Sequence, residues 1–137
     1  FSDVESVSAT FTKVYNQYPG CEESGEALIK FKSGLIASIA AGWIDIAQPY
    51  TIFVSGTKAH ARTTNEKLII NENKDGKKIE RIEENLPETL PHAFDLFLNS
   101  LIDNNTKNLV TPTEAALRSS IMESIYQSEK EKKWINI

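Results

Sequence analysis

The chain has 137 residues, of which 40% are hydrophobic and 25% charged, and its formal net charge is −4. These values fit one soluble domain with its own core, and the negative charge argues against nucleic acid or an anionic membrane as a partner. The single cysteine, Cys21, excludes an internal disulfide, and no apolar run is long enough to span a bilayer, so we expect a cytoplasmic protein.

The first part of the chain alternates apolar with polar residues, as the strands of a half-buried sheet do. This alternation predicts a first strand within residues 3–15. Residues 27–32 and 35–43 lie on either side of Ser33-Gly34, which predicts an antiparallel hairpin. Shorter strands follow, the last two of them joined by a turn at Asp75-Gly76: residues 50–56, 59–63, 67–71 and 78–82.

The last part of the chain predicts two helices. Five apolar residues with helical spacing indicate an amphipathic helix: Phe94, Phe97, Leu98, Leu101 and Ile102. Thr111, Pro112 and Glu114 have the spacing of a capping box, which predicts that a second helix begins there and reaches about Lys130. Residues 134–137 predict a short closing strand.

Strands that precede helices are typical of the α+β class. We expect one large, mostly antiparallel β-sheet with the helices packed on one of its faces. Two helices cannot cover both faces of so large a sheet, so the other face should be open for contact with a second subunit or another domain. We expect residues 1–137 to form a single domain.

The motifs of common catalytic sites are missing from the sequence. The six glycines include no G-x-G pair, so neither a dinucleotide fingerprint nor a P-loop is present. His60 and His92 lie in no metal-binding frame, and Ser55 is not part of a G-x-S-x-G elbow because position 53 is Phe. We therefore predict no catalytic, cofactor-binding or metal-ligating residue in this chain.

Four segments, in order along the chain, carry a resemblance to a known family: residues 31–37 with Gly42-Trp43, residues 53–59, residues 93–101, and residues 110–116 leading through 125–130. They resemble the C-terminal domain of the glucose–fructose oxidoreductase / inositol dehydrogenase / rhizopine catabolism (Gfo/Idh/MocA) family. The second segment is similar to that family's G-T-x-G turn, with Ala59 in place of the last glycine.

The resemblance implies a two-domain parent protein that transfers hydride between NAD or NADP and a hydroxyl group of a sugar, polyol or related compound. Such a parent has an N-terminal Rossmann domain, an E-K-P lysine and an Asp-x-x-x-His pair, and this chain contains neither of the two motifs. The chain is thus expected to be a C-terminal fragment that is inactive alone, binds no cofactor itself, and forms a homodimer or higher homo-oligomer through its open sheet face.

The resemblance also implies that the loop from Trp43 to Tyr50 reaches the substrate. Asp45, Gln48 and Tyr50 would then hydrogen-bond substrate hydroxyls, and Trp43 would stack on a sugar face. Plainer interpretations exist, with Trp43 as a core or interface aromatic and Asp45 as the cap of a strand or turn. A second functional class also stays open, a stand-alone module that binds a protein partner through its open sheet.

Overall fold

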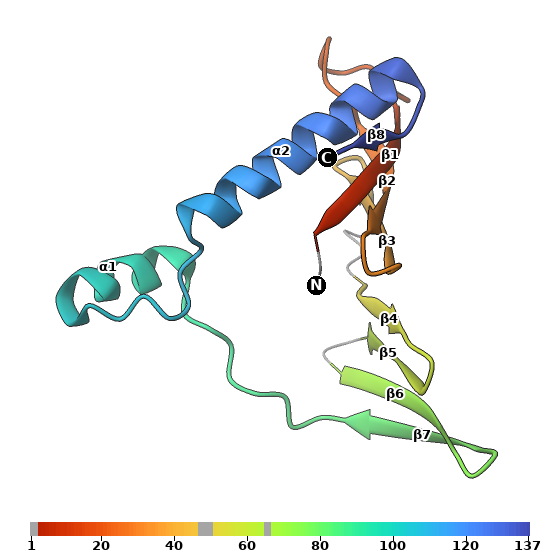
Figure 1. Cartoon of the computed structure of the whole chain (residues 1–137), viewed down its shortest axis with the longest axis vertical. Helices are drawn as coiled ribbons and strands as arrows, with labels where there is room; N and C mark the ends of the chain where they lie inside the picture. Colours follow the sequence, from red (N-terminus) through yellow and green to blue (C-terminus); the bar gives the residue numbers. More distant parts are fainter. Residues whose placement is uncertain (1–2, 47–50, 65–66) are drawn as a thin grey trace. The chain divides into compact units, whose positions relative to one another are not determined.

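The computed structural model describes residues 3–46, 51–64 and 67–137. The chain divides into two units, the first formed by Phe1–Ala47 with Thr106–Ile137 and the second by Gln48–Asn105. Within the described ranges, no helix is long and apolar enough to cross a membrane. In chain order the elements are β1 (Val4–Thr12), β2 (Ser24–Phe31), β3 (Ile36–Gly42), β4 (Phe53–Ser55), β5 (Ala59–Thr64), β6 (Lys67–Lys74), β7 (Lys77–Glu83), α1 (Ala93–Asp103), α2 (Pro112–Glu131) and β8 (Ile135–Asn136), as labelled in Figure 1.

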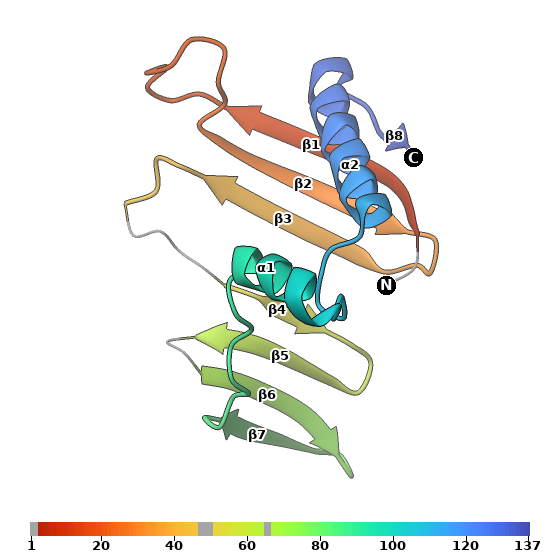
Figure 2. The ribbon, with the colours of Figure 1, turned by 90° about the vertical axis from the view of Figure 1, so that its left-hand side faces the viewer.

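The sheet of the first unit has the strand order β3-β2-β1-β8, and neighbouring strands are antiparallel (Figure 2). Val7 lies opposite Ile29, and Ala9 lies opposite Ala27. Directly opposed residues of an antiparallel pair project from the same face of the sheet. The alternation in the sequence therefore gives this sheet one apolar face.

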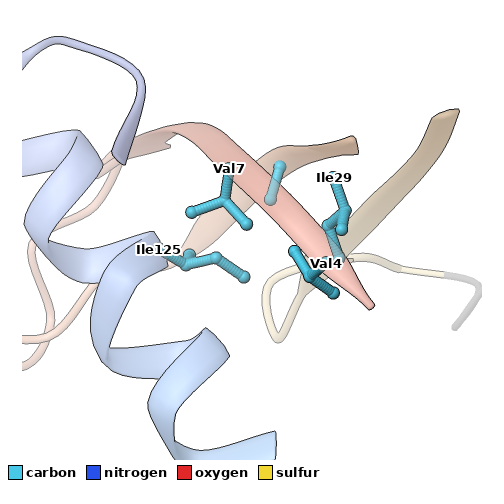
Figure 3. Close-up of a cluster of buried hydrophobic side chains, with 5 residues drawn as sticks. Val4, Val7, Ile29 and Ile125 are labelled. Atoms are coloured by element: carbon cyan, nitrogen blue, oxygen red, sulfur yellow. The ribbon is translucent and has the colours of Figure 1, made fainter. Parts of the chain in front are cut away.

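Helix α2 covers that apolar face. Its Ile125 packs with Val4, Val7, Ala27 and Ile29 into the buried core of the first unit. Figure 3 shows Ile125 of α2 beside Val7 of β1. A helix laid on one face of a sheet removes both apolar surfaces from water, which is the main favourable term in folding this unit.

Polar contacts fix the two ends of α2. At its start, Thr111 and Glu114 form the predicted capping box, with the Glu114 amide donating to Thr111 Oγ1 at 3.2 Å. Near its end, the fully buried Ser128 hydroxyl accepts a hydrogen bond from Ala9 N at 3.1 Å and donates one to Lys133 O at 2.7 Å. Ser128 thus joins the helix to β1 and to the chain that returns as β8.

The sheet of the second unit has the strand order β4-β5-β6-β7, again antiparallel throughout. The turn between β6 and β7 is formed by Asp75 and Gly76, with φ angles of 53° and 77°. Two successive positive φ angles are the mark of a type I′ hairpin turn, which Asp-Gly favours because glycine has no Cβ. The hairpin predicted at this position is confirmed.

The second unit has no buried apolar side chain among its described residues, and its one buried residue is Ser100 of α1. Helix α1 is capped by His92, whose Nδ1 accepts a hydrogen bond from Phe94 N at 3.3 Å. The apolar side chains of α1, predicted to be core, are exposed: Phe94, Phe97, Leu98, Leu101 and Ile102.

The α+β class and the antiparallel pairing are confirmed. The sequence predicted one large sheet, and the described strands form two sheets of four. Within the described residues, β3 pairs with β2 and the three-residue β4 pairs with β5, and no ladder joins β3 to β4. Alternation identifies strands and their faces, but it does not show which strands are neighbours.

Candidate functional site

Trp43, at the end of β3, is held in place through both its backbone and its ring. Its amide donates to Glu23 O at 3.1 Å, and its indole Nε1 donates to Glu22 O at 2.7 Å. The ring centroid lies 5.5 Å from that of Tyr18 in a tilted arrangement. Trp43 nevertheless remains 48% exposed. An exposed aromatic ring in a fixed orientation is what stacking on a sugar face requires.

Asp45 is exposed, and its carboxylate lies close to Gly42. A Cβ added to Gly42 would come within 2.6 Å of Asp45 Oδ2 and 3.3 Å of Ser24 Oγ, so a larger residue here would displace the Asp45 carboxylate. A hollow of about 290 Å³ opens here, lined by Glu22, Glu23, Ser24, Ala41, Gly42 and Trp43. The other two predicted substrate contacts, Gln48 and Tyr50, lie outside the described residues.

Glu22 and Tyr126 meet beside Trp43, although sequence reasoning singled out neither of them. The Tyr126 hydroxyl, on α2, donates a hydrogen bond to the Glu22 carboxylate. This hydrogen bond is the main cause that lowers the pKa of Glu22 and raises the pKa of Tyr126. Because Glu22 O also accepts the indole N–H of Trp43, residue 22 connects the end of β3 to α2.

Glu23 is a buried carboxylate, with only 1% of its surface exposed. It accepts hydrogen bonds from the backbone amides of Val14, of Tyr15 at 2.8 Å and of Gln17 at 3.1 Å. Burial raises the pKa of Glu23, but the backbone hydrogen bonds together outweigh burial and the pKa lies below its ordinary value. The ionised carboxylate therefore anchors the loop that leads to Tyr18.

Five of these residues form one surface of the first unit, which we call the Trp43 corner: Tyr18, Glu22, Trp43, Asp45 and Tyr126. Glu23 is buried and anchors the adjoining loop. Aromatic faces can stack on the C–H face of a sugar ring, and carboxylate oxygens accept hydrogen bonds from hydroxyl groups. Of the four predicted substrate contacts, the structure places Trp43 and Asp45 at this corner. The Trp43 corner has the chemistry of a binding surface for hydroxylated molecules.

A smaller hollow of about 170 Å³ lies between α2 and the sheet of the first unit. Its walls are mainly apolar and include Phe11, Ile39, Met122 and Tyr126. The ring of Phe11 meets that of Tyr126 edge to face, with centroids 5.0 Å apart. Such walls offer packing to an apolar group and little hydrogen bonding.

The two histidines make structural contacts. The His60 ring lies beside that of Phe53 in a tilted arrangement with centroids 5.6 Å apart, and His92 caps α1. Within the part of the chain that the structure describes, no three His, Cys, Asp or Glu side chains form a group that could hold a metal ion.

No protein-family model and no curated protein matches this chain. Solved structures do match it. A protein from Thermotoga maritima assigned as an oxidoreductase matches with a TM-score of 0.77 and 18% identity, over 98% of this chain and 41% of its own. An NAD-binding protein from Listeria innocua matches with a TM-score of 0.74 and 18% identity, over 98% of this chain and 42% of its own. Levoglucosan dehydrogenase in complex with NADH and levoglucosan matches with a TM-score of 0.72 and 14% identity, over 98% of this chain and 45% of its own.

The chain has the fold of one part of these proteins.

At identities of 14–18% the likeness concerns the fold, and at that level it agrees with the resemblance to the C-terminal domain of the Gfo/Idh/MocA family. The shared fold accounts for nearly all of this chain, while the chain spans less than half the length of each of these proteins.

Proposed function

We propose that this chain is the substrate and oligomerisation domain of a two-domain, NAD(P)-dependent oxidoreductase that acts on a sugar, polyol or related hydroxyl compound. The observation that supports this most directly is the fold match, which covers 98% of this chain but only 41–45% of oxidoreductase and NAD-binding chains. The remaining part of such a protein would carry the Rossmann domain.

The residues of this chain do not fit a dinucleotide, because its glycines include no G-x-G pair to approach a pyrophosphate. NAD or NADP would supply hydride acceptance or donation, and residues outside this chain would hold it. The contribution of this chain would be to bind and orient the substrate. A fragment with this composition would be inactive alone.

The Trp43 corner supports the substrate part of the proposal. The indole is oriented by its bond to Glu22 O, so a sugar face can stack on it without first ordering the side chain. Asp45 offers a carboxylate to neighbouring hydroxyls. Gln48 and Tyr50 follow in the same loop and would complete the set of polar contacts, as the family resemblance implies.

The second unit supports the oligomerisation part. Val54, Ala61 and Ile70 lie opposite one another across β4, β5 and β6. They belong to one sheet face, which we call the apolar face and whose apolar side chains are Ile52, Val54, Ala59, Ala61, Leu68, Ile70 and Ile79. The same face also carries Thr63, Glu72, Arg81 and Glu83. Val54 is 58% exposed and Ile52 is 47% exposed. Exposed apolar side chains gathered on one sheet face and bordered by polar ones are typical of a contact between subunits or domains.

The exposed sheet of the second unit also favours one alternative, a stand-alone module that binds a protein partner. The two functions differ in what the gene encodes before Phe1, because only the oxidoreductase requires a G-x-G-x-x-G unit there. A gene without that unit would leave the interaction module as the function.

The activity test uses the whole gene product, with NAD or NADP and a panel of sugars and polyols. We expect reduction of the nucleotide, and we expect Trp43→Ala to raise KM roughly tenfold while the melting temperature changes little. Trp134→Ala is the matched control, because Trp134 is equally exposed at 48% and lies outside the corner. Equal KM values for the two variants would contradict a substrate role for Trp43.

A further inference from the structure

A group of cationic and carboxamide side chains lies at one end of the sheet in the second unit. Asn73 of β6 lies opposite Lys78 of β7. On the side away from β7, the backbone N–H of Asn73 donates a hydrogen bond to Lys58 O at 3.5 Å. The neighbouring row on the same face contains Asn71, which lies opposite His60 of β5. Residues two apart on a strand share a face, so these five residues gather on one side of the sheet.

These five residues line one hollow of about 300 Å³, together with Gly56, Thr57, Ala59 and Glu72. We call it the β-end hollow. A hollow of this size admits a phosphate group and part of the molecule that carries it. The lining donors are two ammonium groups, an imidazole, two carboxamides and the Thr57 hydroxyl.

The charge of the β-end hollow is opposite to that of the chain as a whole. Lys58 and Lys78 stand in a protein of net charge −4, and within the described residues neither forms an ion pair. Glu72 is the one carboxylate in the lining, and Glu80 lies opposite Asn71 in the next row. Two ammonium groups around one hollow repel each other. A dianion bound between them would attract both groups and offset that repulsion.

Edge protection explains only part of this arrangement. Lysines on an edge strand discourage pairing with another chain, and that accounts for Lys78 on β7. It does not account for Asn71 and Asn73, which lie on the interior strand β6 and face the same side as the lysine. Asparagine is also disfavoured in strands, so two of them at alternate positions need another reason.

His60 is positioned before any ligand arrives. Its ring lies beside that of Phe53 in a tilted arrangement with centroids 5.6 Å apart, and the residue is partly buried. A donor that is already oriented loses little entropy on binding.

We propose that the β-end hollow binds the phosphate group of a small phosphorylated molecule, with Lys58 and Lys78 supplying charge and His60, Asn71 and Asn73 supplying directed hydrogen bonds. This site is independent of the oxidoreductase function, and its test involves no nucleotide and no enzyme assay.

The test is isothermal titration calorimetry of the whole protein with inorganic phosphate, at constant ionic strength set by chloride. We expect saturable binding, and we expect the double variant Lys58→Gln/Lys78→Gln to weaken it about tenfold or more. The variant Lys58→Arg/Lys78→Arg keeps both charges and should retain binding.

The matched control is Lys74→Gln/Lys77→Gln. These lysines lie opposite each other in the same hairpin, one residue along from the Asn73–Lys78 pair, and so belong to the other face. The control removes the same charge and should bind phosphate as the wild type does. An equal loss of phosphate affinity in the two double variants would overturn the proposal, because it would show an effect of general charge. Binding heats from succinate equal to those from phosphate would overturn it for the same reason.

Discussion

The two units of this chain are made from similar strands, yet among the described residues only the first unit has a buried apolar core. In the first unit Val7, Ala27 and Ile29 are buried because α2 supplies Ile125 to cover them. In the second unit the strands carry Val54, Ile70 and Ile79 in the same alternating pattern, and none of these side chains is buried. Alternation therefore gives a sheet an apolar face, and that face is buried only where a second layer packs on it.

The two units also differ in the source of their free energy of folding. The first unit gains its free energy of folding from its own apolar contacts. The second unit has four strands and an amphipathic helix whose apolar side chains are exposed. A sheet with two uncovered faces gains little from the hydrophobic effect, so the second unit should depend on contacts that its own described residues do not provide.

The largest expected effect comes from emptying the core of the first unit. We expect Ile125→Ala to lower the free energy of unfolding by about 2–5 kcal/mol, since it leaves a cavity against Val7 and Ile29. Ile70→Ala in the second unit is the matched control, and we expect it to cost less than about 1 kcal/mol in the unassociated protein. Urea denaturation followed by circular dichroism measures both. Similar losses would mean that the second unit has a core of its own.

A smaller effect is expected from placing a charge on the apolar face of the second unit. Val54→Asp should raise the dissociation constant of the oligomer by about thirtyfold or more, because a carboxylate would be buried without a partner. Ile82→Asp is the control, since Ile82 is 51% exposed and pairs with Ile69 on the opposite face. Light scattering after size-exclusion chromatography gives the mass. If the wild-type protein is monomeric at all concentrations, the apolar face does not form a contact between subunits.

The smallest effect is confined to one loop of the first unit. The pKa of Glu23 is lowered by folding, so its contribution is fully present above the unfolded value of about 4.3 and is lost as the pH falls through the lower folded value. Glu23→Gln should speed hydrogen exchange at the amides of Val14 and Tyr15 and remove this acid dependence.

Exchange rates corrected for intrinsic pH dependence provide the measurement. Glu26→Gln is the control, because Glu26 is an exposed carboxylate on β2, three residues after Glu23. Protection that is the same in wild type and in Glu23→Gln would show that the carboxylate does not hold the loop.

Sequence reasoning found most elements because they depend on neighbours in the chain. The capping box at Thr111 and Glu114 and the Asp75-Gly76 turn are local patterns, and both are present. Trp43 is predicted at the end of a strand, and it directly follows β3. Its role as a substrate contact stays a prediction.

The roles of Glu23, Ser128 and Tyr126 could not be predicted in the same way. Glu22 and Glu23 are identical neighbours in the sequence, and only the fold shows that one meets Tyr126 while the other receives three loop amides. Tyr126 lies 104 residues from its partner. A pattern of apolar spacing contains no signal for polar pairs that meet through tertiary structure.

The ring of Phe11 lies directly over Gly25 on the neighbouring strand, and a Cβ at position 25 would come within 2.5 Å of it. A benzyl group on one strand thus occupies the space that a methyl group on the next would need. Evolution can enlarge position 25 only after position 11 has become smaller, so across homologous sequences these two sites should covary.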